Sequence, residues 1–151
     1  MGEAPAGEVV NGIFRLPVRV YYEDTDAGGI VYHASYLRFA ERARTEMLRT
    51  VGVEQTTLRE ELGVGFVVRR CEIDFRAAAS LDDLLWVETR MTALKGASIE
   101  AVQIVKHADD DAQALVEMNI VIACIDGKGR PVRLPKEARS RLEHHVSGIA
   151  N

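Results

Sequence analysis

The sequence predicts an α+β domain in which an antiparallel sheet wraps around one long helix. Apolar side chains recur at steps of three and four residues over residues 34–51, which is typical of an amphipathic helix. From Phe66 onward, apolar and polar residues alternate, which is typical of strands buried on one face. Because one amphipathic helix needs a surface on which to bury its apolar side, the two patterns together predict a helix packed on a sheet.

Three elements are expected before the sheet. β-branched and aromatic residues predict a strand over residues 16–22, which the bend EDTDAGG (residues 23–29) interrupts. The long helix is expected over residues 34–51, with Gly52 where a helix commonly stops. A shorter helix is expected over residues 55–62.

The rest of the chain predicts four strands joined by short connections. They are expected within residues 66–75, 85–91, 100–105 and 114–125. Parallel neighbours need a crossover of a dozen or more residues, so these strands are expected to form an antiparallel meander.

The length of 151 residues suits one domain. We expect a flexible leader over residues 1–14, a single domain over residues 15–145 and a tail over residues 146–151. No internal repeat or linker divides the domain.

Composition and charge argue against several classes of function. The net charge is −4 and the isoelectric point is near 5.6, so no general attraction to nucleic acid is expected. The longest strongly apolar run, residues 120–125, is far shorter than a membrane-spanning helix, so we expect no membrane insertion. The N-terminus lacks a signal-peptide pattern, and Cys71 and Cys124 are too far apart for a metal-type spacing. We therefore expect a cytoplasmic protein with reduced cysteines, no metal and no cofactor.

The bend before the long helix carries the chemistry that the sequence can offer. No nucleophile elbow and no glycine-rich phosphate loop occurs elsewhere in the chain. One reading of the bend is a simple turn, since Asp and Gly are turn residues and His33 or Ser35 could cap the helix. The other reading is an acyl-transfer site. Successive glycines, Gly28 and Gly29, let a ligand approach the free N–H groups at the helix start, while a nearby carboxylate acts as nucleophile or general base.

The segment YYEDTDAGGIVYHASYLRFAERARTEMLR (residues 21–49) resembles the signature of the Tol-Pal-associated acyl-CoA thioesterases. These form a branch of the 4-hydroxybenzoyl-CoA thioesterase-like hotdog-fold superfamily. The resemblance extends over residues 15–142 and includes FVVRR, LDDLLWVET and PVRLPKEAR. It implies the hotdog fold, in which an antiparallel sheet wraps around a central helix. It also implies a homo-oligomer, a dimer with a continuous sheet or a homotetramer, with active sites at the dimer interface.

The resemblance also implies roles for individual residues. Asp26 matches the catalytic carboxylate, the second acid of the D-x-D motif, while Asp24 matches the first acid, which has another role. His33 matches a position implicated in catalysis, where the backbone N–H of aromatic-substrate relatives polarises the thioester carbonyl, and Tyr22 matches a further active-site position. The loop expected to approach the substrate contains Gly28, Gly29, Val31 and Tyr32. The residues expected to contact the phosphates of CoA are Lys95, Ser98, Arg69 and Arg70.

The expected reaction is hydrolysis of an acyl-CoA thioester to a free acid and CoA. Ala27 and His33 stand where the aromatic-substrate relatives have proline and an aromatic residue, which shifts the expectation toward short-chain aliphatic acyl groups. An acyl-carrier-protein thioester is an alternative substrate. Two other functions stay open at this point: a hotdog hydratase or dehydratase, and a non-catalytic acyl-thioester-binding or scaffold subunit.

Overall fold

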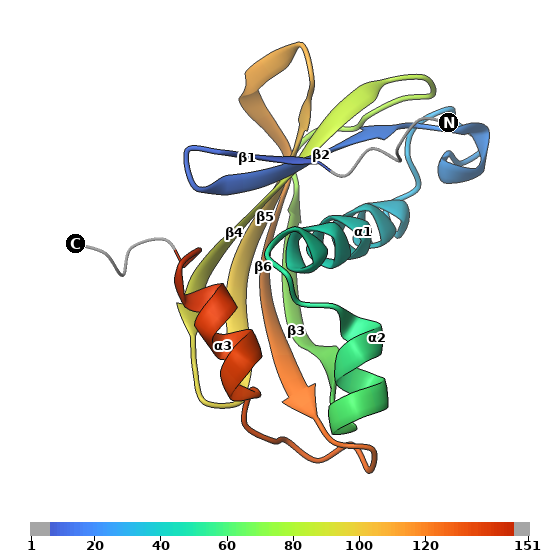
Figure 1. Ribbon diagram of the computed structural model, residues 1–151. Coiled ribbons are helices and arrows are strands. Elements are labelled where there is room, and N and C mark those ends of the chain that lie inside the picture. The colour runs from blue at the N-terminus through green and yellow to red at the C-terminus, as the bar shows by residue number, and fades with distance from the viewer. Residues whose placement is uncertain (1–6, 147–151) are drawn as a thin grey trace, which may run out of the picture.

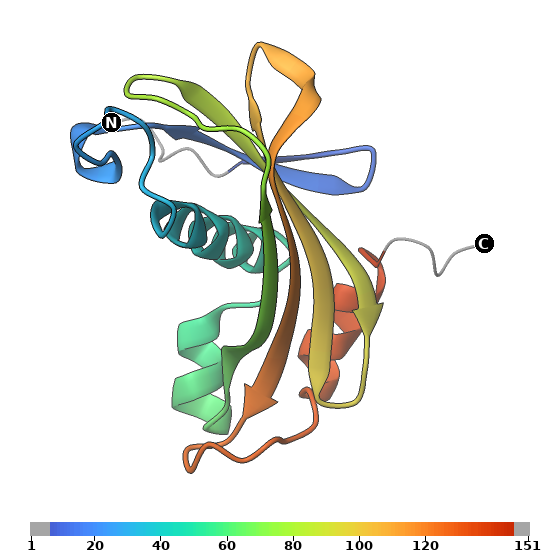
Figure 2. The same cartoon turned by 180° about the vertical axis from the view of Figure 1, so that it is seen from behind.

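A computed structural model describes residues 7–146, which form one six-stranded antiparallel sheet with helices against a single face (Figures 1 and 2). The α+β prediction is therefore confirmed. The strands are β1 (Glu8–Val10), β2 (Ile13–Arg19), β3 (Gly65–Phe75), β4 (Leu84–Leu94), β5 (Ser98–His107) and β6 (Asp110–Ile125). Their order across the sheet is β1-β2-β4-β5-β6-β3, so β1 and β3 lie at the two edges.

The long helix, α1 (Ser35–Thr50), agrees with the expected residues 34–51 to within one residue at each end. Its apolar side packs on the sheet, with contacts to β2 and β4. In β4 the buried side chains alternate, as the period of two predicted. The core between helix and sheet includes Phe39, Ala40, Ala43, Met47, Leu85, Val87, Met91, Val105 and Met118.

Two shorter helical segments cover the same face beyond the end of α1 (Figure 1). The first consists of α2 (Gln55–Thr57) followed by the π-helical turn η2 (Leu58–Leu62), which confirms the helix expected over residues 55–62. The second is α3 (Lys136–Glu143), which buries Ala138 and Leu142. Within residues 7–146, no helix has the length and apolar character needed to cross a membrane.

The predicted four-strand meander is wrong for its first strand. Strand β3 pairs with β6 rather than with β4, and β4 pairs instead with β2. The segment between β3 and β4, residues 76–83, therefore carries the chain from one edge of the sheet to its middle. In this order β4 lies between β2 and β5, and the outer side of β6 is left to pair with β3.

The boundaries expected at both ends of the domain also need correction. Residues 8–14, expected in a flexible leader, form β1 and the start of β2. The two strands pair as a hairpin, with Glu8 opposite Arg15 and Val10 opposite Ile13. The strand expected over residues 16–22 is β2, which runs over Ile13–Arg19. It starts earlier than expected because its buried side chains begin at Phe14. Val146, expected in the tail, is buried and bridges to Met91. The remaining leader residues 1–6 and tail residues 147–151 lie outside the described residues.

Candidate active site

The bend between β2 and α1 is a small, internally bonded structure. It begins with the 3₁₀ turn η1 (Tyr22–Asp24) and continues as a narrow loop whose two sides meet at an antiparallel bridge between Thr25 and Val31. Across this loop the Asp26 N–H donates to the Ile30 carbonyl oxygen at 2.9 Å. The interruption of the strand that the sequence predicted is thus an ordered loop.

Asp24 is a structural member of this bend. Its side chain is buried, and Oδ2 accepts a 2.8 Å hydrogen bond from the Tyr21 N–H. Its carbonyl oxygen accepts two more hydrogen bonds, from the Tyr32 N–H at 2.9 Å and from the Ser35 hydroxyl at 3.1 Å. Both ends of the bend are therefore joined through Asp24.

Asp26 has the opposite environment. It is exposed, and its Oδ1 accepts a 2.8 Å hydrogen bond from the Gly28 N–H, which fixes the carboxylate as an Asx turn. Among residues 7–146, no group donates a hydrogen bond to Asp26 Oδ2. One oxygen thus orients the carboxylate and the other faces outward, available to a water or a substrate carbon.

The two glycines that follow have separate structural reasons. A Cβ at Gly28 would lie 3.2 Å from Asp26 Oδ1, close to the oxygen that the Gly28 N–H binds. Gly29 has a φ of +82°, in the left-handed region that side chains disfavour. The loop is held against the segment before β4 by hydrogen bonds from the Val31 N–H to the Ala79 carbonyl and from the Leu81 N–H to the Gly29 carbonyl.

The start of α1 lies directly after this loop, and no side chain among the described residues caps it. Neither His33 nor Ser35 acts as a cap, which removes one support for the simple-turn reading. Across residues 7–146, the backbone N–H groups of His33 and Ala34 find no hydrogen-bond acceptor. Free N–H groups at a helix start, where the helix dipole is positive, are suited to bind a negatively charged oxygen.

The aromatic side chains around His33 are partly exposed. The His33 ring lies 4.5 Å from the Tyr32 ring, centroid to centroid, and meets Phe75 of β3 edge-on at 6.2 Å. Within the described part of the chain, no hydrogen bond orients the imidazole. Tyr22 is 83% exposed in η1, so it borders the bend without packing into it.

The residues expected to bind CoA do not gather at this bend within one chain. The start of β4 lies next to the loop, and Lys95 follows its other end. An 11-residue strand separates the two by roughly 30 Å. Its Nζ pairs with Glu100 at 2.9 Å, and Ser98 is buried. Arg69 and Arg70 lie on the edge strand β3, where the register shifts at a bulge, and both are exposed.

Sequence reasoning missed the residues that support the segment before β4, to which the loop is hydrogen-bonded. The Tyr36 hydroxyl accepts a 3.0 Å hydrogen bond from the Ala79 N–H, and the pKa of this buried tyrosine is raised by its burial. Asp83 accepts hydrogen bonds from the Ser80 N–H and from His107 Nε2, each at 2.8 Å. Asp83 precedes β4 and His107 ends β5, 24 residues further on, and no local pattern in the sequence links them.

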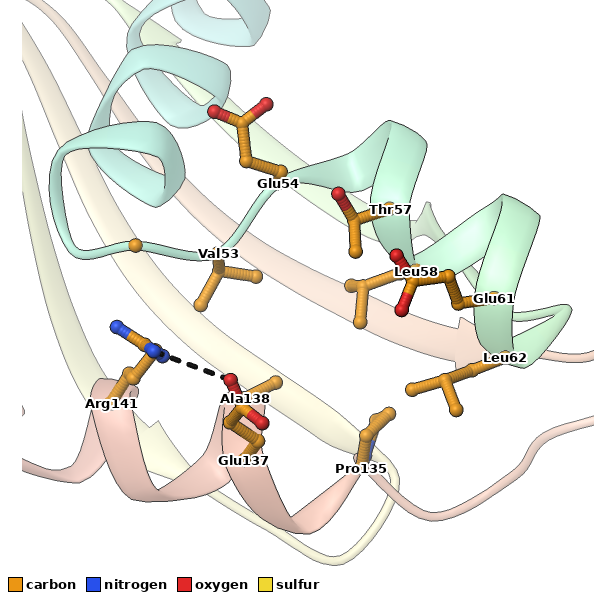
Figure 3. A pocket seen from close by; sticks show the side chains of 11 residues that line it. Val53, Glu54, Thr57, Leu58, Glu61, Leu62, Pro135, Glu137, Ala138 and Arg141 are labelled. Carbon is orange, nitrogen blue, oxygen red and sulfur yellow. Dashed lines mark hydrogen bonds and ion pairs between the residues drawn. The ribbon is translucent and has the colours of Figure 1, made fainter.

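A separate cavity of about 240 Å³ lies between α2, η2 and α3 (Figure 3). Its floor is apolar, with Val53, Leu58 and Ala138, and its rim includes the Arg141–Glu137 ion pair. None of the site residues expected from the sequence lines it. In the part of the chain that the structure describes, no three His, Cys, Asp or Glu side chains come together as a metal site. Cys71 and Cys124 are both free thiols.

The fold and the bend define a class of protein, the hotdog-fold thioesterases. The structure aligns with a Bartonella henselae structure named "Probable Thioesterase" at a TM-score of 0.76 and 40% identity, covering 82% of this chain and 99% of that one. It aligns with a 1,4-dihydroxy-2-naphthoyl-CoA thioesterase from Synechocystis at a TM-score of 0.78, covering 92% and 98%. That second match, at 21% identity, supports the fold alone.

Sequence comparison then gives the family. The model of the Thioesterase-like superfamily matches residues 20–142, and the chain belongs to this family. Acyl-CoA thioesterase YbgC of Haemophilus influenzae is 51% identical over 132 residues, which are 87% of this chain and 95% of that protein. Acyl-CoA thioester hydrolase YbgC of Escherichia coli O157:H7 is 48% identical over 125 residues, covering 82% and 91%. The family resemblance inferred from the bend is confirmed.

Proposed function

We propose that this chain hydrolyses acyl-CoA thioesters to a free acid and CoA. The observation that carries the proposal is the exposed, oriented carboxylate of Asp26 in the loop that leads into the uncapped start of α1. The activities of the H. influenzae and E. coli relatives support the same reaction. A turn that served only structure would not need a second, outward-facing acid beside the buried Asp24.

In this proposal Asp26 acts through Oδ2, in one of two ways. As a general base it takes a proton from water, and the resulting hydroxide attacks the thioester carbon. As a nucleophile it attacks that carbon itself and forms an anhydride that water then hydrolyses. In either case the C–S bond breaks, and the CoA thiolate leaves and takes up a proton. General-base action contributes roughly 10²–10⁴-fold to the rate, so positioning and charge stabilisation supply most of the remainder.

The oxyanion formed during the attack would be bound by the N–H groups of His33 and Ala34. These groups have no acceptor among residues 7–146, so binding the oxyanion breaks no hydrogen bond that the structure describes. Donors that are fixed before the reaction need no reorganisation as negative charge develops. The loop of Gly28, Gly29, Val31 and Tyr32 would form the wall past which the thioester enters, with Tyr22 beside it.

We propose short-chain aliphatic acyl-CoA as the substrate class, in a cytoplasmic enzyme that acts without a cofactor. Arg69 and Arg70 are the candidates for the nucleotide phosphates within one chain. Lys95 and Ser98 could serve the same nucleotide only from another copy in an oligomer. Such an oligomer would form along β3, whose outer edge has no strand partner within residues 7–146 and which exposes Val67, Val68 and Phe75. A dimer joined there would continue the sheet, and two dimers would make the expected homotetramer.

A panel of acyl-CoA and acyl-carrier-protein thioesters tests the function. Release of free thiol from short-chain acyl-CoA, in preference to the carrier-protein thioesters, is the expected result. Hydration of an enoyl-CoA without thiol release would instead indicate a hydratase. Binding of acyl-CoA without either reaction would indicate a non-catalytic subunit and would contradict the proposal.

His33→Ala separates the two possible roles of that residue. If only the backbone N–H acts, the alanine variant keeps most of its kcat, because alanine retains the N–H. If the imidazole takes part, kcat falls about as far as in Asp26→Asn. Comparing the two variants with the same substrate identifies the group that acts.

A further inference from the structure

The loop that carries Asp26 is anchored from outside the bend by the segment before β4. The Val31 N–H donates to the Ala79 carbonyl oxygen at 2.8 Å, and the Leu81 N–H donates to the Gly29 carbonyl oxygen at 3.3 Å. An antiparallel bridge lies between these two bonds. Within residues 7–146, no other backbone hydrogen bond joins the loop to a part of the chain outside the bend.

This anchor bears directly on the position of the Asp26 carboxylate. The Gly28 N–H orients the carboxylate within the loop, and the bridge between Thr25 and Val31 closes the loop behind it. Neither contact fixes the tip of the loop relative to the start of α1, whose N–H groups would bind the oxyanion. The position of the acid relative to those groups therefore depends on the segment that holds the tip.

Two side chains hold the part of the segment that pairs with the loop. The Tyr36 hydroxyl accepts the Ala79 N–H at 3.0 Å. Ser80 and Asp83 are joined twice, because the Asp83 N–H donates to the Ser80 carbonyl oxygen at 3.1 Å and the Ser80 N–H donates to Asp83 Oδ2 at 2.8 Å. Backbone hydrogen bonds to the end of β2 fix only the last two residues of the segment.

His107 fixes the carboxylate oxygen that holds this turn. Its Nε2 donates at 2.8 Å to Asp83 Oδ2, the same oxygen that accepts the Ser80 N–H. The side chains of His107 and Asp83 are 30% and 31% exposed, so the bond to the charged acceptor is partly shielded from water, which strengthens it. Without the imidazole, the carboxylate could rotate toward water and release the Ser80 N–H.

We propose that His107 is a positioning residue for Asp26, acting through Asp83 and the segment before β4. The inference rests on the proposed thioesterase function and adds to it a residue of β5, outside the bend. A misplacement of a reacting group by about 1 Å can lower a rate by about 10²-fold, so a loosened loop should lower kcat. The binding surface for the substrate keeps its residues, so KM should change little.

The test measures kcat and KM for acyl-CoA hydrolysis where circular dichroism shows each variant to be folded. His107→Ala should lower kcat by roughly 10-fold or more and leave KM nearly unchanged. His107→Gln places an amide N–H near the position of Nε2 and should restore most of kcat. His144→Ala removes an exposed histidine at the end of α3 and should change neither constant. A merely structural role would lower stability without this pattern.

A double-mutant cycle tests whether His107 acts through Asp83. In an Asp83→Asn protein the charged acceptor is already lost, so adding His107→Ala should lower kcat little further. Equal effects of His107→Ala with and without Asp83→Asn would overturn the proposal. A normal kcat in a folded His107→Ala protein would overturn it as well. If His107→Ala does not fold, a normal kcat of the Asp83→Asn protein has the same meaning.

Amide hydrogen exchange measured by NMR gives a readout that does not depend on activity. His107→Ala should speed the exchange of the Val31 and Leu81 N–H groups, which join the loop to the segment, whereas His144→Ala should not. Unchanged exchange at both groups would overturn the proposal. Absence of thiol release from every acyl-CoA by the unsubstituted protein would instead refute the proposed function, and the exchange rates would still show whether His107 holds the loop.

Discussion

The backbone N–H of Tyr32 donates to the carbonyl oxygen of Asp24 at 2.9 Å and so closes the bend that leads into α1. With this bond in place, the two acids of the D-x-D motif are separated. Asp24 turns inward and binds the Tyr21 N–H, while Asp26 stays at the surface, where no donor in the described part of the chain binds its second oxygen. The two residues should consequently respond very differently to substitution.

Asp26→Asn should abolish nearly all thioester hydrolysis without unfolding the protein. The asparagine oxygen can still accept the Gly28 N–H and preserve the Asx turn, but an amide is neither a base nor a nucleophile here. We expect kcat to fall by at least about 10²-fold, the lower end of a general-base contribution. Thiol release gives the rate and circular dichroism the fold. A folded Asp26→Asn protein with normal turnover would refute the assignment.

Asp24→Ala should mainly reduce stability. The substitution leaves the Tyr21 N–H without its charged acceptor in a partly buried position, which costs about 1.5–3 kcal/mol of unfolding free energy. Urea unfolding of this variant beside Asp26→Asn measures the difference. Equal unfolding free energies for the two variants would show that the inward and outward acids do not have these separate roles.

Tyr36→Phe tests how the segment before β4 supports the site. The tyrosine hydroxyl accepts the Ala79 N–H, and both residues are buried. Phenylalanine fills the same volume but leaves that N–H unpaired, so the unfolding free energy should fall by about 1–3 kcal/mol. Because Ala79 also accepts the Val31 N–H of the loop, we expect a loss of kcat beyond any change in KM. Tyr21→Phe, an exposed substitution, is the matched control.

The sequence predicted the elements whose pattern is local. The three- and four-residue spacing placed α1 to within a residue, and the alternation in β4 identified Leu85, Val87 and Met91 as its buried face. The position of β3 could not be predicted in this way. Its neighbour, β6, is far away in the sequence, and eight connecting residues can lead equally to a hairpin or to a crossing.

For the candidate site, the sequence predicted the residues of the bend but not the hydrogen bonds that support it. The acids, glycines and helix start lie within about a dozen residues, so a motif can contain them. The Tyr36–Ala79 hydrogen bond joins residues that are 43 positions apart in the sequence, and the Asp83–His107 hydrogen bond joins residues that are 24 positions apart. Only the fold brings these residues together. Lys95 is the opposite case. Its turn motif suggested a place in the site, but the fold puts it at the end of β4 that is far from the loop.

Substituting Val68 should weaken an oligomer joined along β3. Val68 is 47% exposed on this edge strand, next to the bulge. Val68→Lys would place two like charges in a symmetric contact, where desolvation and repulsion oppose pairing. Light scattering should then report a mass near that of the 16.7 kDa chain, where the unsubstituted protein gives a multiple of it. Leu81→Lys, an exposed substitution outside β3, should leave the mass unchanged.

The Asp83–His107 pair makes stability depend on pH. Burial raises the pKa of Asp83, but the hydrogen bonds from the Ser80 N–H and His107, together with the histidine charge, outweigh it and hold the pKa below its usual value. An aspartate whose folded pKa is lowered stabilises the fold above its unfolded pKa, about 3.9, and loses this contribution as pH falls through the folded value.

Asp83→Asn should therefore reduce the unfolding free energy at neutral pH and have a diminishing effect in acid. We expect a difference from the unsubstituted protein near pH 5, and a difference that shrinks steadily below about pH 4. Urea unfolding at a series of pH values measures it. Asp82→Asn removes the same charge from the neighbouring exposed residue, whose positive φ of 71° asparagine tolerates, and should show no such trend. A difference for Asp83→Asn that stayed constant down to pH values below the folded pKa would mean that the carboxylate charge contributes nothing to holding this segment.

Because the segment supports the Asp26 loop through Leu81 and Gly29, thioester turnover should be lost over the same acid range.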